Sequence, residues 1–293
     1  TLVNYCPHCK VVLSNEDSQG GKCDICHSDI IQKSKEVWYL RITEYADKLL
    51  FGLDKVDYLP NIKLQQENWI GRSEGAFANF KLTNCDENES LRIYTTRCDT
   101  MFGVTFMVIA PEHPIIEKYR DRIANIADLD AYKEACAKKT EFERTQLVKD
   151  KTGVCIEGIS AINPANGKEI PIYISDYVMM GYGTGAIMAV PAHDERDYDF
   201  AKKFGIDIIE VIKGGDISKE AYTGDGKMIN SDFLNGITTK AEAIDAMIKV
   251  LGEKGIGEKG VQFKMKDWAF NRQRYWGEPI PIVHCPHCGM VPV

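Results

Sequence analysis

Two closely spaced pairs of cysteines constrain the fold of this chain more than any other feature of its sequence. Cys6 and Cys9 form one Cys-x-x-Cys pair, Cys23 and Cys26 form a second, and thirteen residues separate the two pairs. Each pair offers two thiolates from one turn, and four thiolates complete a tetrahedral zinc site. Because four protein ligands leave no open position for water, such a zinc ion is structural rather than catalytic. The sequence therefore predicts a small zinc-ribbon module at residues 1–34.

A third Cys-x-x-Cys pair, Cys285 and Cys288, lies near the end of the sequence and has no further pair after it. We expect that this half-site does not hold zinc tightly by itself and that the sequence stops part-way through a module. The first residue is Thr1 rather than methionine, so we also expect a processed or excised piece. His8 and His27 lie beside the first two pairs and are less favoured alternative ligands.

The composition is that of an ordinary globular protein. The 293 residues, 44% of them hydrophobic and 27% charged, suffice for one large domain or two, plus small appendages. The formal net charge of −7 argues against a general nucleic-acid coat protein but allows a local contact with a nucleic-acid end. We find no apolar run of membrane-spanning length and no signal-peptide pattern. We therefore predict a cytoplasmic monomer without a membrane partner, in a reducing compartment.

The stretch 181–197, GYGTGAIMAVPAHDERD, combines features of several elements. Alternating glycines precede a short apolar run, and Pro191 ends that run because proline donates no N–H to a sheet. Asp194 and Asp197 then open a helical pattern that reaches Gly205. The stretch therefore predicts a glycine turn, a buried strand, a tight loop and an acidic helix start.

The two carboxylates at this helix start allow two interpretations. In the structural interpretation, Asp194 is the N-cap and Asp197 is its partner, as in a capping box with Asp in place of Glu. In the functional one, both carboxylates lie on one face beside the N–H groups of the first turn and meet a ligand. The glycines also suggest a nucleotide-dependent oxidoreductase. That alternative is weak, since a dinucleotide fingerprint has a strand before its glycines and a helix after them.

Strand-like and helix-like patterns alternate along the rest of the chain. The predicted elements are strands at 77–82, 91–94 and 208–212, a hairpin turning at Asn166-Gly167, and helices at 36–59 and 239–251. Pro60 is predicted to end the helix at 36–59. This interleaving predicts an α/β fold of mixed α+β type.

Two further segments are rich in side chains that can form hydrogen bonds or bind a ligand. Residues 95–100 bring three threonines, an arginine and an aspartate together between two strand-like runs, which is a dense set of hydrogen-bonding groups. Residues 263–277 interleave basic and aromatic side chains. That pattern fits stacking and phosphate pairing with a nucleic acid, and it fits equally well a segment whose aromatic side chains are core.

Four motifs, taken in order, resemble bacterial leucyl-tRNA synthetase. They are TTRCDTMFG at 95–103, APEHP at 110–114, GYGTGAIMAVPAHDERD at 181–197 and DWAFNRQRYWGEPIP at 267–281. The isoleucine and valine enzymes share the threonine-rich motif but usually have Trp or Glu where Asp99 stands, so Asp99 points to leucine. An editing domain of the isoleucyl or valyl type is the alternative within this resemblance.

The resemblance implies a particular domain organisation. It implies a zinc module at 1–34, a connector at 35–70, a compact editing domain at 71–265 built around a β-barrel-like sheet with surrounding helices, and the start of the synthetic core at 266–293. The His-x-Gly-His and Lys-Met-Ser-Lys-Ser motifs that handle ATP in the family are absent from the sequence. We therefore expect no aminoacylation by this chain alone.

The activity that the resemblance implies is hydrolysis of the ester of mischarged tRNA(Leu), carrying norvaline or isoleucine. Such editing is needed because binding separates aliphatic side chains by only about 1–3 kcal/mol per methylene. The partners implied are the tRNA(Leu) 3′ end and the rest of the synthetase chain. A positioned water attacks the ester, leucine is sterically excluded, and no cofactor takes part. The alternative function, from a different functional class, is that of a non-catalytic module that binds the tRNA 3′ end.

The resemblance also assigns roles to residues. The catalytic group comprises Asp197, which holds the α-ammonium of the amino acid, Thr100, which excludes leucine, and Thr95 and Thr96, which place the water and the ester. The substrate-binding group is Arg97, which contacts the tRNA 3′ end, with Asp99, Tyr182, Met188, His193 and Asp194. Neither His193 nor Asp194 is assigned as a general base.

Cys98 departs from the family, which usually has proline at this position. Proline fixes φ and lacks an N–H, so we expect a looser loop here. We also expect an oxidisable thiol beside the pocket.

Overall fold

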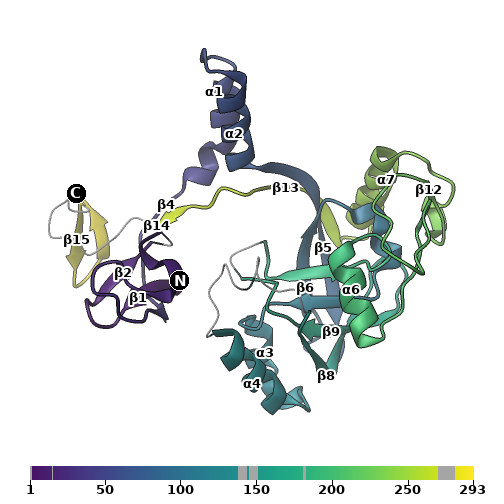
Figure 1. Ribbon diagram of the computed structural model, residues 1–293, viewed down its shortest axis with the longest axis horizontal. Coiled ribbons are helices and arrows are strands. Elements are labelled where there is room, and N and C mark those ends of the chain that lie inside the picture. Colours follow the sequence, from purple (N-terminus) through teal and green to yellow (C-terminus); the bar gives the residue numbers. More distant parts are fainter. Residues whose placement is uncertain (1, 15, 138–143, 145–150, 181–182, 270–280) are drawn as a thin grey trace. The chain divides into compact units, whose positions relative to one another are not determined.

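The computed structural model describes residues 2–14, 16–137, 144, 151–180, 183–269 and 281–293. The chain divides into two compact units, one comprising Thr1–Glu44 with Lys266–Val293 and the other Tyr45–Met265 (Figure 1). The finer domain boundaries at residues 34, 70 and 265 stay predictions. Within the described ranges, no helix is both long enough and apolar enough to cross a bilayer.

The first unit contains a three-stranded antiparallel sheet of order β2-β1-β3. Its strands are β1 (Leu2–Cys6), β2 (Val11–Leu13) and β3 (Ile31–Ser34), and a 3₁₀ helix, η1 (Glu16–Gly21), follows β2. Cys6, Leu13 and Cys23 form its small buried core. A core of this size is too small to stabilise a module alone, so a metal or another cross-link is expected.

Two shorter pairings complete the first unit. β4 (Tyr39–Leu40) pairs with β14 (Trp268–Ala269), so the two chain segments of this unit meet there. Beside this pairing, Thr43 donates to Asp267 Oδ1 from its backbone N–H at 3.1 Å and from its hydroxyl at 2.8 Å. β15 (Ile282–Cys285) and β16 (Gly289–Pro292) form a hairpin.

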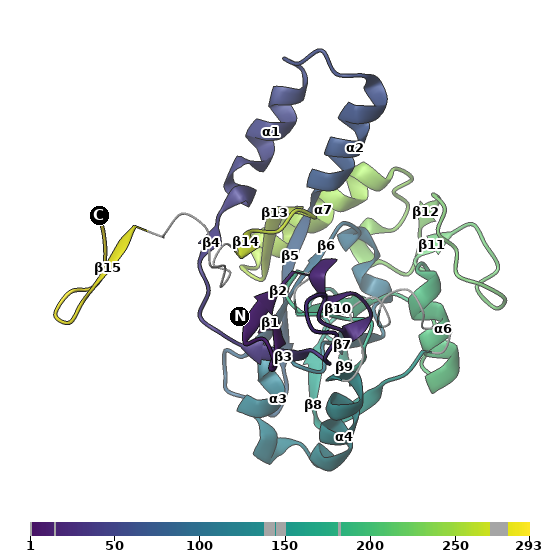
Figure 2. The ribbon, with the colours of Figure 1, turned by 60° about the vertical axis from the view of Figure 1, so that its left-hand side comes forward.

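The predicted helix at 36–59 is wrong in its extent. After β4 and the 3₁₀ turn η2 (Ile42–Tyr45), the helix α1 spans only Ala46–Leu53. Pro60 begins a second helix, α2 (Pro60–Ile70), because proline's fixed φ and missing N–H suit the first helical turn. Figure 2 shows α1 and α2 side by side as an antiparallel hairpin.

A seven-stranded mixed sheet forms the centre of the second unit. Its strands are β5 (Arg72–Leu82), β6 (Ser90–Thr95), β7 (Phe106–Ile109), β8 (Val154–Ile162), β9 (Glu169–Ile174), β10 (Ala186–Ala189) and β13 (Gly257–Phe263). The order is β10-β7-β9-β8-β5-β13, with β6 paired to β5. Among the strand pairs of the described residues in this sheet, β7 and β9 run parallel and the others antiparallel. The strands predicted at 77–82 and 91–94 and the hairpin at Asn166-Gly167 are confirmed within β5, β6 and the β8–β9 connection.

The β-barrel-like sheet that the resemblance implied is not what the structure contains. β10 approaches β6, yet no hydrogen-bonded ladder joins these two strands within the described residues. The sheet is therefore open, since closure needs each strand to be paired on both sides. The broader expectation of a mixed α/β domain is correct.

Helices and short elements surround this sheet. They are η3 (Cys98–Gly103), α3 (Pro114–Lys118), η4 (Arg120–Arg122), α4 (Ile126–Ala137), α6 (Glu195–Phe204), β11 (Ile212–Lys213), β12 (Lys227–Met228), η5 (Asp232–Leu234) and α7 (Lys240–Glu253). α7 packs against β13 and η3, and α4 packs against β8. The predicted helix at 239–251 is confirmed by α7, whereas the predicted strand at 208–212 is reduced to the two residues of β11.

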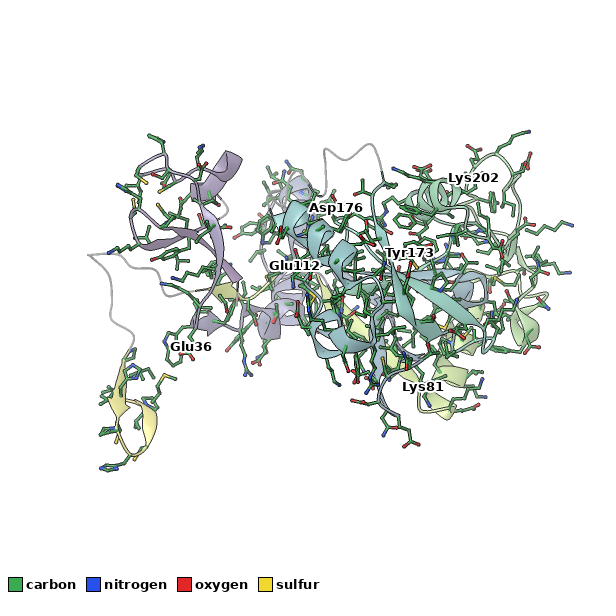
Figure 3. All side chains as sticks on the ribbon, turned by 90° about the horizontal axis from the view of Figure 1, so that it is seen from below. Glu36, Lys81, Glu112, Tyr173, Asp176 and Lys202 are labelled. Carbon is green, nitrogen blue, oxygen red and sulfur yellow. The ribbon has the colours of Figure 1, made fainter. Side chains whose placement is uncertain are left out.

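An aromatic cluster fixes α6 against the sheet. Phe200 of α6 stacks on Phe106 of β7 with ring centroids 5.1 Å apart, and it meets Tyr173 of β9 edge-on at 5.3 Å (Tyr173 is labelled in Figure 3). Phe204, one turn later, stacks on Phe200 at 4.4 Å. Phe200 is fully buried. The start of α6, which carries the two aspartates, is therefore held at a defined place beside the sheet.

Candidate functional site

The threonine-rich segment begins where β6 ends. Thr95 lies opposite Ala76 of β5, and its hydroxyl accepts the backbone N–H of Arg97 at 3.0 Å. The neighbouring β5 backbone is so close that a Cβ on Gly75 would lie 2.3 Å from the Thr95 carbonyl oxygen. Thr96 is exposed. The chain thus leaves the sheet through a tight turn that presents Thr96 to solvent.

Arg97 and Asp99 form a largely enclosed ion pair. Arg97 Nε donates to Asp99 Oδ1 at 3.0 Å, and Nη2 donates to Oδ2 at 2.9 Å. The side chain of Asp99 is 1% exposed and that of Arg97 is 24% exposed. Thr100 is also buried, and its hydroxyl donates to the Arg97 carbonyl oxygen at 2.9 Å. These bonds fold residues 97–100 into the compact turn that opens η3.

Cys98 does not present its thiol to a pocket. The residue is fully buried, its Sγ lies 3.8 Å from the carbonyl oxygen of Ile244 on α7, and burial raises the pKa of the thiol to about 12. A buried, protonated thiol is a weak nucleophile and reacts slowly with oxidants. The position is the first residue of η3, where a missing N–H costs little.

Asp194 and Asp197 occupy the start of α6, as the sequence predicts. Asp194 is the N-cap, and its Oδ1 accepts the backbone N–H groups of Arg196 at 2.9 Å and Asp197 at 3.2 Å. The capping-box interpretation is only half correct, because the side chain of Asp197 does not accept the backbone N–H of Asp194. Its Oδ2 instead accepts the backbone N–H of Val190, at the end of β10, at 2.8 Å.

The carboxyl group of Asp197 is held in an unusual electrostatic environment. The residue is 6% exposed. Burial, helped by the negative charge of Asp194, raises the pKa of Asp197 to about 7, while the bond from Val190 and the charge of Arg196 act in the opposite direction. A buried carboxyl with a raised pKa gains strongly from an added cation, which makes it a candidate functional group.

His193 ties this loop to a distant segment. Its Nε2 lies 3.0 Å from the backbone N of Val211 and 3.1 Å from that of Ile212, and its Nδ1 lies 2.7 Å from the carbonyl oxygen of Tyr222. Burial lowers the pKa of His193, and the positive charge of Arg97 lowers it further.

The two predicted motifs come together at this point. A Cβ on Gly103, which ends η3, would lie 3.2 Å from Val190 Cγ1 and 3.1 Å from Val211 Cγ2. The end of the segment 95–103 therefore lies against the start of the segment 190–197, about 90 residues later in the sequence, and we treat the two as one candidate site.

The remaining predicted residues are placed as follows. Met188 is buried on β10, opposite Met107 of β7. Tyr182 lies outside the described residues, as do residues 270–280 of the basic and aromatic C-terminal segment. Two hollows are found on the described surface, one of about 470 Å³ at the end of α6 and one of about 750 Å³ bordered by Phe102 and Lys168. Neither hollow is lined by the threonines of the segment 95–100 or by Asp197.

The four predicted cysteines of the first unit form a compact cluster. One ligand atom from each of Cys6, Cys9, Cys23 and Cys26 lies within 4.8 Å of the others. Thiolates at the corners of a tetrahedral zinc site are about 3.8 Å apart, so the cluster fits a metal of this kind. Hydrogen bonding from Ser28 lowers the pKa of Cys26 to about 5, which favours the thiolate form that a metal needs. Hydrogen bonding with Cys26 raises the pKa of Cys9 to about 12, and burial raises that of Cys23.

The last Cys-x-x-Cys pair has the same local turn as the first. The backbone N–H of Cys288 lies 3.4 Å from Cys285 Sγ, as that of Cys9 lies 3.3 Å from Cys6 Sγ. Cys285 and Cys288 belong to no group of three or more metal-ligating side chains within the described residues.

The match to a known family lies within the second unit of the chain. The family described as "Leucyl-tRNA synthetase, editing domain" matches residues 67–252, which include both segments of the site. This chain belongs to that family. The match favours the leucyl-tRNA synthetase editing domain over the isoleucyl and valyl alternative.

Curated relatives and a solved structure agree with this assignment. The leucine–tRNA ligase of Alkaliphilus oremlandii is 56% identical over 293 residues, which are 99% of this chain and 36% of that protein. The leucine–tRNA ligase of Elusimicrobium minutum is 54% identical over 292 residues, 99% of this chain and 34% of that protein. The crystal structure of the Agrobacterium radiobacter K84 agnB2 LeuRS–tRNA–LeuAMS ternary complex superposes with a TM-score of 0.75 at 33% identity, over 100% of this chain and 33% of that chain. The editing-domain chain thus spans about a third of these relatives.

The sequence analysis did not identify two residues that contact the segments of the candidate site. Asn163 is fully buried, and its side-chain amide donates to the carbonyl oxygen of Met101 in η3 at 2.9 Å. Tyr222 supplies the carbonyl group that faces His193. Asn163 lies in an ordinary-looking Asn-Pro turn, and Tyr222 acts through its backbone, so neither has a residue pattern that points to the site.

Proposed function

We propose that this chain hydrolyses the ester bond of mischarged tRNA(Leu), the post-transfer editing reaction of leucyl-tRNA synthetase. The observation that carries the proposal is the buried carboxyl of Asp197, held by the N–H of Val190, whose side chain lies near Gly103 at the end of η3. The substrates are tRNA(Leu) esters of norvaline and isoleucine. The family match and the meeting of the two motifs support this assignment.

Asp197 binds the α-ammonium group of the esterified amino acid. One carboxylate oxygen already accepts the Val190 N–H, so the group is oriented before the substrate arrives. The positive charge of the ammonium stabilises the ionised carboxylate and lowers the pKa of Asp197 on binding. This contact fixes the amino acid at one end, while the ester lies toward Thr95 and Thr96.

Thr100 excludes leucine from this position. Its hydroxyl is committed to the Arg97 carbonyl oxygen, which leaves the methyl group as the part that limits the space for an amino-acid side chain. A rigid methyl group rejects a branched side chain by overlap, whereas binding alone discriminates weakly between aliphatic side chains.

A positioned water attacks the ester carbonyl. His193 is poorly placed to act as its base, because both ring nitrogens face backbone groups. Asp194 is engaged as the N-cap. Proximity and the neighbouring ribose hydroxyl of the tRNA then assist the water. Unchanged hydrolysis of a substrate that lacks this hydroxyl would exclude its participation.

The tRNA 3′ end is the macromolecular partner at this site. Arg97 uses Nε and Nη2 to hold Asp99, and Nη1 has no hydrogen-bond partner within the described residues, so it is available to a phosphate or ribose. The tRNA in the related ternary complex supports this partner. The rest of a synthetase chain, which the relatives possess, is the second partner. Zinc is the metal that we assign to the four-cysteine cluster, with a structural role.

The test is deacylation of tRNA(Leu) preloaded with norvaline, isoleucine or leucine, using this chain and its Asp197→Ala variant. We expect release of norvaline and isoleucine, retention of leucine, and loss of release in the variant. Binding of tRNA(Leu) without release of any amino acid would favour the alternative, a non-catalytic module for the tRNA 3′ end.

A further inference from the structure

The imidazole of His193 is bound on both sides by backbone groups. Two N–H groups, those of Val211 and Ile212, point at Nε2 at 3.0 and 3.1 Å, and the carbonyl oxygen of Tyr222 lies 2.7 Å from Nδ1. The residue is 8% exposed. A histidine with this degree of enclosure contacts no substrate directly in this arrangement.

The partners decide which ring nitrogen carries the proton. Nε2 faces two donors, so it must be the acceptor and carry no hydrogen. Nδ1 faces a carbonyl oxygen, so it must carry the hydrogen and donate. The ring is therefore the neutral Nδ1–H tautomer, with no lone pair left to accept a proton from water.

The loop that carries His193 also carries the attachment of Asp197. The carbonyl oxygen of Val190 accepts the backbone N–H groups of His193 at 2.9 Å and Asp194 at 3.1 Å, while the Val190 N–H donates to Asp197. Movement of this loop would therefore move the group that orients the Asp197 carboxylate.

Val211, one of the residues bonded to His193, also contacts the end of η3. Val211, which donates to His193, is fully buried and lies against the backbone of Gly103 at the end of η3. Tyr222 is joined to the His193 loop by a second bond, from its backbone N–H to the carbonyl oxygen of Ala192 at 2.8 Å. His193 thus lies on a short chain of contacts between Asp197 and η3.

We infer that His193 is a positioning residue that fixes Asp197 relative to the threonine segment. The inference rests on the proposed function, since the purpose of this spacing is to hold the ammonium of an aminoacyl ester at Asp197 while the ester meets Thr95 and Thr96. The imidazole contributes hydrogen bonds alone, and no proton transfer passes through it.

The test compares two substrates that differ only at the α-amino group that Asp197 recognises: norvalyl-tRNA(Leu), with a charged ammonium, and N-acetyl-norvalyl-tRNA(Leu), with a neutral and bulkier amide. The measured quantity is the ratio of their kcat/KM values for the wild type, His193→Ala, His193→Gln and Asp197→Ala. We expect His193→Ala to reduce the ratio at least tenfold, toward that of Asp197→Ala. We expect His193→Gln to retain most of it, because the glutamine amide both accepts and donates hydrogen bonds.

Three outcomes would overturn the inference. An equal loss for both substrates in His193→Ala would make the residue structural only. A folded His193→Gln variant as inactive as His193→Ala would indicate proton transfer. The third outcome comes from nitrogen NMR of the His193 ring near neutral pH. A charged ring or the Nε2–H tautomer would contradict the hydrogen-bond assignment, whether or not hydrolysis occurs. A wild type that hydrolyses neither substrate, or shows no preference for the free amine, would instead contradict the proposed function.

Discussion

Arg97 and Asp99 form an ion pair across a single intervening residue, and the carboxylate of Asp99 is 1% exposed. The pair closes the turn between β6 and η3. It also gives a physical reason for an aspartate at this position rather than a tryptophan, because a tryptophan offers Arg97 no anionic partner.

Arg97→Ala is therefore expected to destabilise the fold. It leaves the Asp99 carboxylate buried without its cation, and removing one partner of a buried pair costs about 3–5 kcal/mol. Chemical denaturation measures the loss. The matched control is Lys249→Ala, since Lys249 and Glu253 form an exposed pair on α7 whose removal costs about 0–1 kcal/mol. Equal stabilities for the two variants would contradict the account of the Arg97–Asp99 pair.

The raised pKa of Asp197 predicts an inverted pH dependence of stability. The folded state keeps the proton up to about pH 7, whereas the unfolded chain releases it near pH 4, roughly the ordinary value. Between these values the folded state binds more protons, so the contribution of this group is fully present below about pH 4 and is lost as the pH rises through 7.

Asp197→Asn should remove this dependence. The amide oxygen can still accept the Val190 N–H, and the buried charge is gone. We expect the variant to exceed the wild type in free energy of unfolding at pH 8 by about 1–4 kcal/mol, and we expect this difference to shrink toward zero as the pH falls to about 4. The control is Asp199→Asn, an exposed carboxylate on the same helix, which should show no such difference. A variant that is less stable than the wild type at pH 8 would contradict the burial argument.

Cys98 should resist modification in the folded protein. Its burial and raised pKa, about 12, predict that a thiol reagent labels the exposed Cys288 first and reaches Cys98 only after denaturation. Mass spectrometry of the labelled peptides measures the order. Rapid labelling of Cys98 in the native state would show that the turn opens more readily than its packing against Ile244 implies.

The four-cysteine cluster predicts metal content that depends on particular residues. We expect about one zinc per chain, lost in Cys23→Ser and retained in Cys288→Ser. The reason is that Cys23 is one of the four clustered thiols and Cys288 is not. Chelation should unfold the first unit while α6 and its aromatic cluster in the second unit stay intact. Equal metal loss in both variants would mean that the last Cys-x-x-Cys pair shares the site.

Much of the fold follows from local patterns in the sequence. The strand at 186–189, the loop after Pro191 and the Asp194 N-cap all form as predicted, because each depends on the residues within a few positions of it. Pro60 was misjudged since proline both ends and begins helices, and the pattern alone does not say which. Whether a sheet closes into a barrel depends on pairing between β6 and β10, which are distant in sequence, so the sequence does not decide it.

The hydrogen bonds that connect the candidate site could not be predicted from the sequence, although its motifs are visible there. The threonine segment and Asp197 were found from their motifs. Their connection depends on backbone groups of Val190, Val211 and Tyr222, and a backbone N–H or carbonyl has no residue identity that marks it. The bond partner of Arg97 was likewise unpredicted, although the two-residue spacing to Asp99 is visible in the sequence.

The central claim, an editing site that spares leucine, is tested most directly with leucyl-tRNA(Leu) itself. The measurement is the rate of leucine release by the wild type and by Thr100→Ala, with norvalyl-tRNA(Leu) as the reference substrate. The account predicts slow leucine release by the wild type and an increase of at least tenfold in Thr100→Ala, while norvaline release stays within a few-fold. Rapid leucine release by the wild type, or no change in the variant, would contradict it.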